Sequence, residues 1–170
     1  MKVVIPKADD FKIHERVLES IYEQEGVDLE IIIVSRPGSN TNQLIDHRRC
    51  ESSTKQECLQ YIKDEEFAVM NDADNFHLRN DNLSTMLKYL KKNSEWGGVV
   101  AYWGRIPIVN MEPFHIPYRC LMMRKDAWNI VKFHIDADIC TCPSVSESVR
   151  NTGFRYGYVD PIIRTCECYK

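Results

Sequence analysis

The stretch "FAVMNDADNF", residues 67–76, decides what kind of fold and site this sequence encodes. Its first five residues, 67–71, are mostly apolar and predict a buried β-strand. Asp72 and Asp74 follow directly, and two explanations are open for them. Asn and Asp are common turn formers, so the segment can simply end the strand. Carboxylates grouped at a strand end are also hard oxygen ligands for a cation.

The composition is that of an ordinary globular chain of 170 residues, long enough for one domain with a sizeable core. Hydrophobic residues make up 44% and charged residues 28%, and no apolar run is long enough to cross a membrane. The net charge is −3 without a basic stripe, which argues against a nucleic-acid partner. The apolar stretch within residues 1–10 is too short for a signal peptide, so we expect a cytoplasmic protein.

The chain contains seven cysteines, which is a high number for its length. An odd number without a signal peptide argues against a full disulfide framework. Cys140 and Cys142 form one C-x-C pair, and Cys166 and Cys168 form another. Each pair could converge on one face of a strand. Zinc binding, disulfide formation and plain burial as small apolar side chains all stay open.

Apolar periodicity predicts strands that alternate with helices over the first part of the chain. We expect strands at 2–6, 29–35, 66–71 and 97–104, and helices at 10–25, 54–63 and 80–92. The continuous β-branched run at 29–35 is typical of a strand covered on both faces. The alternation predicts right-handed crossovers and a three-layer α/β/α fold with a mainly parallel sheet. Ligands of such sheets bind beyond the carboxyl ends of the strands, where Asp72 and Asp74 stand.

The second half of the chain is less regular. "YRCLMMRKDAWNIV", residues 118–131, predicts a strand that leads into a short helix. "PSVSESVRN", residues 143–151, predicts a last helix with Ser144 and Glu147 as its capping box. Gly153 should end that helix before a final strand within residues 154–164.

The two aspartates point to a particular chemistry. If the backbone stays extended, Asp72 and Asp74 project to the same side and repel each other unless a cation lies between them. Mg²⁺ and Mn²⁺ take one or two protein carboxylates and complete their octahedron with substrate phosphates and water. The sequence has no P-loop, no G-x-S-x-G and no H-E-x-x-H pattern that would favour another chemistry.

The order of these motifs resembles that of the GT-A nucleotide-sugar glycosyltransferases, particularly the large family of inverting enzymes called family 2. The resemblance rests on "VVIP" at 3–6, the D-x-D block at 56–101, "LMMRKDAWNIVKF" at 121–133 and "VRNTGFRYGYVD" at 149–160. Only the block at 56–101 is specific. The resemblance implies a Rossmann-like single domain over 1–170, with a nucleotide-sugar-binding half at 1–101 and an acceptor-side half at 102–170.

The resemblance also implies a function. The protein would be a metal-dependent glycosyltransferase that moves a sugar from a nucleotide-diphosphate donor to an acceptor hydroxyl, with inversion. The acceptor would be a carbohydrate, a lipid or a protein. Asp74 would bind Mn²⁺ or Mg²⁺, Asp72 would reach the ribose or a metal-bound water, and the ion would neutralise the diphosphate leaving group. Pro6, Ala8 and Asp9 match the family's first nucleotide-contacting loop.

Three parts of the sequence depart from the family pattern. The second strand ends in Ser35 and Arg36, where the family usually has aspartates that read the nucleobase or ribose. The usual register of the catalytic base holds no carboxylate, so Asp138 or Asp136 would act as the base if the loop is slightly longer, with Glu147 as a weaker candidate. Cys166 stands where the family often has a histidine metal ligand, and a thiolate suits Mg²⁺ or Mn²⁺ poorly.

Two alternatives to an active transferase stay open. One is a module of the same fold that binds nucleotide sugars or carbohydrates without transferring them. The other is a nucleotidyltransferase, which should carry a glycine-rich basic loop after its first strand; "PKADDF", residues 6–11, has no glycine. The sugar, the nucleotide, the acceptor and the oligomeric state, including a homodimer, cannot be read from this sequence.

Overall fold

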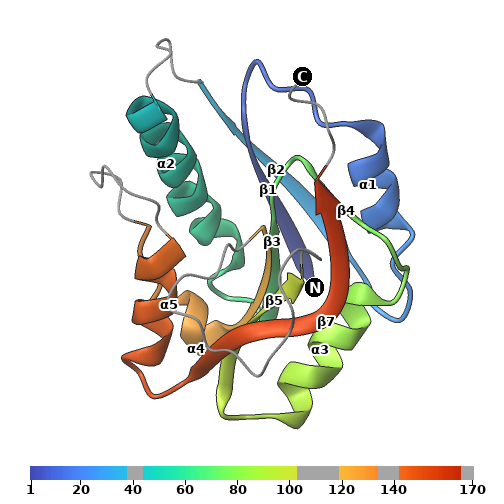
Figure 1. The fold of residues 1–170 in the computed structure, drawn as a ribbon, viewed down its shortest axis with the longest axis vertical. Helices are drawn as coiled ribbons and strands as arrows, with labels where there is room; N and C mark the ends of the chain where they lie inside the picture. Colours follow the sequence, from blue (N-terminus) through green and yellow to red (C-terminus); the bar gives the residue numbers. More distant parts are fainter. Residues whose placement is uncertain (38–43, 103–118, 134–141, 166–170) are drawn as a thin grey trace.

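The computed structural model describes residues 1–37, 44–102, 119–133 and 142–165. Its strands are Lys2–Ala8 (β1), Glu30–Arg36 (β2), Phe67–Asn71 (β3), Asn75–His77 (β4), Trp96–Tyr102 (β5), Cys120–Arg124 (β6) and Arg155–Thr165 (β7). Its helices are Glu15–Tyr22 (α1), Leu44–Ile62 (α2), Asn82–Lys92 (α3), Lys125–Trp128 (α4) and Cys142–Arg150 (α5). The described strands form one seven-stranded sheet in the order β2-β1-β3-β6-β5-β7-β4 (Figure 1).

The sheet is mainly parallel, as predicted. β1 pairs in parallel with both β2 and β3, and β5 pairs in parallel with β7. β6 lies antiparallel between β3 and β5, and the short β4 pairs antiparallel with the end of β7. The strands β1, β2, β3, β5 and β7 therefore run in one direction, and the carboxyl ends of β1, β2 and β3 meet at one edge.

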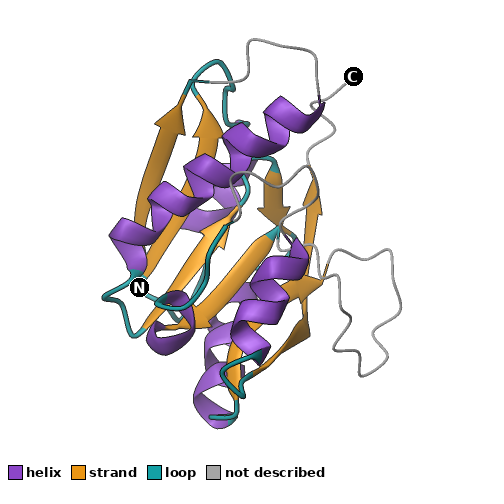
Figure 2. Cartoon of the chain, turned by 90° about the vertical axis from the view of Figure 1, so that its left-hand side faces the viewer, coloured by secondary structure: helices purple, strands orange, loops and turns teal. Residues whose placement is uncertain are grey.

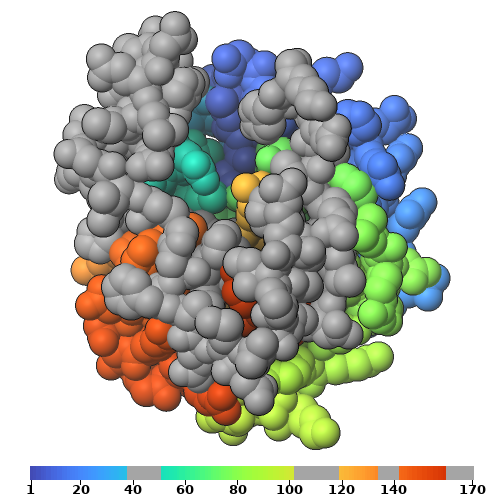
Figure 3. Space-filling view, viewed as in Figure 1, coloured from blue at the N-terminus to red at the C-terminus, as the bar shows by residue number. Residues whose placement is uncertain are grey.

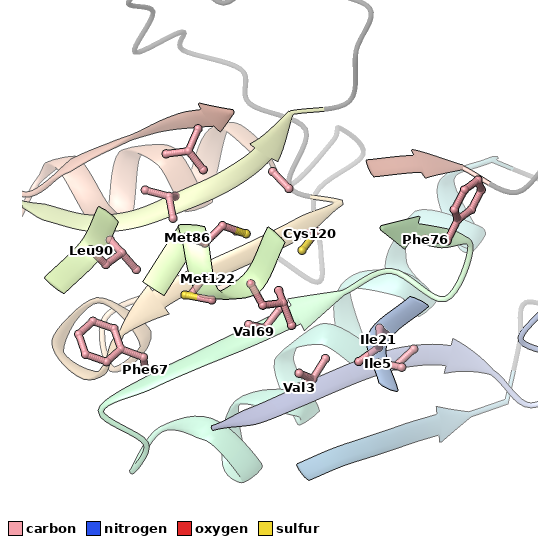
Figure 4. Packing of buried hydrophobic residues seen from close by; sticks show 14 of the residues in the cluster. Val3, Ile5, Ile21, Phe67, Val69, Phe76, Met86, Leu90, Cys120 and Met122 are labelled. Carbon is pink, nitrogen blue, oxygen red and sulfur yellow. The ribbon is translucent and has the colours of Figure 1, made fainter. Parts of the chain in front are cut away.

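The sheet is the middle layer of three. All five residues of β3 are buried, and they alternate between two apolar cores. Phe67 and Val69 face the core formed with α1 and α3, whose side chains are drawn in Figure 4. Ala68 and Met70 face the core formed with α2, α4 and α5. Figure 2, seen from the α2 side, shows the helices of this second layer in front of the strands. The predicted α/β/α architecture is thus confirmed.

The helices of the two outer layers also appear on separate flanks of the surface. On the face shown in Figure 3, the surface of α1 and α3 lies on one side and that of α5 lies on the other. Among the helices of the described residues, none combines the length and the hydropathy that a membrane span requires.

Helix boundaries differ from the sequence prediction at three places. α2 begins at Leu44 instead of residue 54, because residues 46–53 are polar apart from Cys50 and carry no apolar stripe that marks a helix. α1 begins only at Glu15, and the His14 imidazole caps it by accepting a hydrogen bond from the Arg16 N–H. The predicted capping box is wrong, because α5 begins at Cys142 and Ser144 lies inside the helix.

β2 is an edge strand in the described part of the sheet, and the prediction of a strand covered on both faces is confirmed only in part. The Ile33 side chain is 47% exposed, although Val34 beside it is buried. Ile31 and Ile32 pack against opposite cores, each only partly buried. The β-branched run predicted the strand correctly but not its neighbours, because β-propensity reflects local packing and does not report the number of flanking strands.

β7 connects two parts of the sheet that are distant in sequence. Its first half pairs with β5 and its end pairs with β4, where Thr165 lies opposite Asn75. The β5 register shifts between the pairs that involve Val159 and Ile162, and Pro161 lies in that interval. Proline cannot donate to a ladder, so a register shift is a favourable place for it. The β4 strand was not predicted because three residues give no periodicity.

Gly98 of β5 packs too closely against its neighbours to tolerate a side chain. A Cβ atom at Gly98 would lie 2.5 Å from Met123 Cγ and 3.1 Å from Tyr156 Cδ2. We therefore expect Gly98→Ala to lower the free energy of unfolding by about 1–3 kcal/mol, because these buried side chains must move. Urea denaturation measures this change.

Gly153→Ala is the matched control. Gly153 has a φ of 86° but no atom within 4 Å of a Cβ, so its alanine variant tests backbone strain without crowding. That strain should cost about 1 kcal/mol. A Gly98→Ala variant as stable as the wild type would contradict the close packing of β5 on β6.

Candidate functional site

Asp72 and Asp74 lie in a turn at the carboxyl end of β3. The Asn75 N–H donates to the Asp72 carbonyl over 3.1 Å, which closes the turn. The Asn71 side chain fixes it further, because Nδ2 donates to the carbonyl oxygens of Asp72 and Asn75, each at 2.9 Å. The backbone therefore does not stay extended through the two aspartates. The two aspartates thus form a turn, and both carboxylates still lie at the edge of the sheet where β3 ends.

The Asp72 carboxylate is paired with a buried lysine that the sequence interpretation missed. Lys55 of α2 is only 3% exposed, and its Nζ lies 2.9 Å from Asp72 Oδ1 and 2.5 Å from Glu51 Oε1. Burial raises the pKa of Asp72 above its ordinary value, and the Lys55 ammonium opposes that rise. A signal was present: Lys55 stands three and seven residues before Cys58 and Ile62 on the inward face of the helix.

Asp74 has a looser cationic partner. Its Oδ2 lies 3.7 Å from Arg119 Nη1, and its Oδ1 accepts a hydrogen bond of 2.7 Å from the Asn75 amide. Arg119 directly precedes β6, and its carbonyl accepts the Asp72 N–H at 2.8 Å. Burial raises the pKa of Asp74 as well, with Arg119 opposing the rise. Two carboxylates held partly out of water are a pair that a divalent cation stabilises.

A second polar group lies at the ends of β1 and β2. Pro6 and Ala8 are paired with the last residues of β2. The Ser35 hydroxyl donates to the Asp9 carboxylate, and the Lys7 ammonium donates to the Ser35 oxygen over 3.1 Å. The predicted residues of the first loop and of the second strand end are therefore in direct contact at the same edge of the sheet as the Asp pair.

Arg36 points from the end of β2 toward α2. Its Nη1 donates to the Ser53 hydroxyl over 2.7 Å, and its Nε lies 3.4 Å from Glu57 Oε2. α2 thus contacts the predicted site twice, through Lys55 at Asp72 and through this pair at Arg36. α2 is therefore the helix that contacts the carboxyl ends of both β2 and β3.

Several predicted site residues lie outside the described residues. They are the candidate bases Asp136 and Asp138 and the candidate metal ligand Cys166, together with Cys140 and Cys168. Cys58 and Cys120 are buried free thiols in the two cores. Within the described ranges, no three His, Cys, Asp or Glu side chains are close enough to hold a metal ion by themselves. Any ion at the Asp pair would need further ligands from outside this group.

His77 of β4 lies just beyond the turn and is buried. Its Nδ1 is 3.2 Å from the Asn82 amide nitrogen, which donates to it, and its backbone N–H donates to the Ser20 hydroxyl over 3.0 Å. Its Nε2 is buried without a hydrogen-bond partner in the described part of the chain, and burial lowers the pKa of His77 to about 4. The native protein therefore holds this imidazole neutral.

This neutral histidine predicts a pH dependence of stability. Between pH 4 and its ordinary pKa of 6.5, the unfolded chain binds a proton at His77 that the native state does not. Stability from this group should therefore rise with pH across that range, by up to about 3 kcal/mol. The raised pKa of Asp72 makes stability fall as the pH rises. The contribution of His77 is therefore obtained by comparison with a variant that lacks this imidazole. We expect the free energy of unfolding of the wild type minus that of His77→Gln, measured with urea, to increase as the pH rises. Parallel pH profiles of the two proteins would contradict a buried neutral imidazole.

Comparison with solved structures identifies the fold. A mannosyltransferase from Pyrobaculum calidifontis, solved with GDP-Man and Mn²⁺, has 16% identity and a TM-score of 0.69, covering 99% of this chain and 57% of that one. S. aureus TarS 1-349, solved with UDP-GlcNAc, has 11% identity and a TM-score of 0.73, covering 99% and 59%. Glucosyl-3-phosphoglycerate synthase from Mycobacterium tuberculosis, solved with Mg²⁺ and UDP, has 12% identity and a TM-score of 0.61, covering 95% and 69%.

This chain has the GT-A nucleotide-sugar glycosyltransferase fold. It spans less than two thirds of the length of the mannosyltransferase and of TarS 1-349. No protein-family model and no curated protein matches the sequence. The resemblance in motif order is thus confirmed for the fold, and membership of family 2 stays a prediction.

Proposed function

We propose that this chain binds a nucleotide-diphosphate sugar together with Mn²⁺ or Mg²⁺ and transfers the sugar to an acceptor hydroxyl, with inversion. The observation that carries the proposal is the pair of partly desolvated carboxylates, Asp72 and Asp74, beyond β3. Ligands of α/β sheets bind at this edge. The GT-A fold supports the proposal, because solved proteins that share it hold GDP-Man with Mn²⁺ or UDP with Mg²⁺.

The donor set at the turn fits a hard divalent ion. Carboxylate oxygens are the ligands that Mg²⁺ and Mn²⁺ prefer, and two are enough when phosphates and water complete the octahedron. Asp74 would hold the ion and Asp72 would reach the ribose or a metal-bound water. Arg119, 32% exposed beside Asp74, would add a cation for the diphosphate oxygens. The bound ion supplies Lewis-acid stabilisation of the diphosphate leaving group.

The ends of β1 and β2 would hold the nucleoside. Pro6, Ala8 and Asp9 would line it from β1, and Ser35 and Arg36 would line it from β2. β2 lacks the aspartate that the family usually places at this strand end. Because the Asp9 carboxylate lies against the Ser35 hydroxyl, we propose that Asp9 supplies the missing carboxylate from the neighbouring strand.

The remaining roles fall on residues outside the described ranges. Asp138 or Asp136 would take the proton of the acceptor hydroxyl, and Cys166 would be a further, weak metal ligand. The chain would act as one domain over 1–170, with donor binding in 1–101 and acceptor binding in 102–170. The acceptor would be a carbohydrate, a lipid or a protein.

A donor-binding module without transfer activity is the second candidate. It is favoured by the family's register for the base, which falls on Thr141 and Cys142 in this chain. Neither side chain is an adequate general base for a hydroxyl group. Binding and turnover therefore need separate experiments.

Metal-dependent donor binding is tested by thermal denaturation with UDP, GDP and dTDP, each with and without Mn²⁺. We expect one nucleotide with Mn²⁺ to raise Tm by about 5–10 °C at a concentration about a hundredfold above its Kd. Asp74→Asn should abolish the shift, because it removes the proposed ligand.

Asp81→Asn is the matched control for this experiment. Asp81 is an exposed aspartate at the start of α3, paired with Arg79, and its variant should keep the full shift. Absence of a response to every nucleotide, in the presence of Mn²⁺, would refute donor binding.

Turnover is tested by following hydrolysis of the nucleotide sugar that binds. We expect Asp138→Asn, or else Asp136→Asn, to lower the rate by about a hundredfold or more while the Tm shift with nucleotide and Mn²⁺ is kept. Donor binding without hydrolysis or transfer by the wild-type protein would favour the non-catalytic module.

A further inference from the structure

Lys55 is placed where a lysine is seldom found. It lies on the inward face of α2 with Cys58 and Ile62, and its side chain is 3% exposed. Lysine is almost never this deeply buried unless it is paired, because its ammonium group loses the stabilisation of water. Its position therefore depends on the two carboxylates that it contacts.

Those two carboxylates differ in how firmly they are held. Glu51 is one turn earlier on the same helix and is 58% exposed, so water competes for it. Asp72 is 21% exposed, and its main chain is fixed on both sides: its N–H donates to the Arg119 carbonyl and its carbonyl accepts the Asn75 N–H. The ammonium group thus meets a carboxylate whose main chain is held in place on both sides.

The charge of Asp74 is compensated less completely than that of Asp72. Its cationic partner Arg119 lies at 3.7 Å, compared with 2.9 Å between Lys55 and Asp72, and that guanidinium is one-third exposed. Its other oxygen accepts from the neutral Asn75 amide. Attraction between charges falls with distance and with access of water, so Asp74 keeps more of its negative potential.

We propose that Lys55 is a positioning residue of the donor site. It holds the Asp72 carboxylate and takes up its charge, so that Asp74 is left as the carboxylate that binds the divalent ion. This inference rests on the proposed function, because it assigns unequal roles to the two carboxylates of that site. The lysine acts through Asp72 and needs no contact with the donor.

The proposal is tested by titrating the protein with Mn²⁺ and reading free Mn²⁺ by electron paramagnetic resonance, first alone and then with UDP. Asp74→Asn should weaken Mn²⁺ binding by about tenfold or more, whereas the double variant Lys55→Met/Asp72→Asn, which removes both opposite charges of the pair, should change it by less than about threefold. Lys55→Met should strengthen binding by about tenfold, because a buried positive charge beside the ion is removed. Lys55→Arg keeps the charge, so its affinity for Mn²⁺ should equal that of the wild type.

Lys125→Met is the matched control, because Lys125 is an exposed lysine whose Nζ lies 3.9 Å from the exposed Asp64 carboxylate. Its Mn²⁺ affinity should equal that of the wild type. If Lys55→Met does not fold, the double variant Lys55→Met/Asp72→Asn, which leaves no buried charge unpaired at this position, is compared with Asp74→Asn instead.

The outcomes separate this proposal from the proposed function. Equal losses in the double variant Lys55→Met/Asp72→Asn and in Asp74→Asn, or a folded Lys55→Met with unchanged Mn²⁺ affinity, would overturn the role of Lys55 alone. The expected Mn²⁺ pattern with no effect of any nucleotide would overturn the donor site and leave the role of Lys55 standing. A wild-type protein that binds no Mn²⁺ would overturn both.

Discussion

The rest of the structure depends on the burial of β3 between two helical layers. The strand pairs with β1 on one side and β6 on the other, and its side chains alternate between the two cores. A polar side chain within residues 67–70 would face an apolar layer on either side. The first place where the chain can carry charge is the point at which it leaves the sheet, and Asp72 stands there. The core thus fixes the position of the carboxylates.

The sequence predicted those features that one segment can encode by itself. The alternation of strands and helices predicted the layers, and the apolar run at 67–71 and the leucine spacing of α3 were confirmed nearly to the residue. The edge position of β2 was missed, because it depends on which strands lie beside it. α2 was predicted too short, because the beginning of a helix with a polar surface shows no periodicity.

The site was harder to predict than the fold for the same reason. The D-x-D turn is local, so its two aspartates could be found from a single stretch. Lys55 and Arg119, which compensate their charges, are far from them in sequence and come from α2 and from the start of β6. A lysine on an inward helical face was a visible signal, but only the folded chain shows which carboxylate it meets. The contact between Asp9 and Ser35 likewise follows from the pairing of β1 with β2.

The pairing of β4 with β7 has a consequence for how the protein is made. The turn that carries Asp72 and Asp74 runs into β4, and β4 pairs with residues 163–165, about ninety positions later. During synthesis, β1, β2 and β3 can form parallel pairs long before that segment leaves the ribosome. Contacts between such distant segments form slowly, since a long loop must close first. β4, into which the aspartate turn runs, therefore lacks this ladder partner until residues 163–165 have been synthesised and have folded back onto the sheet.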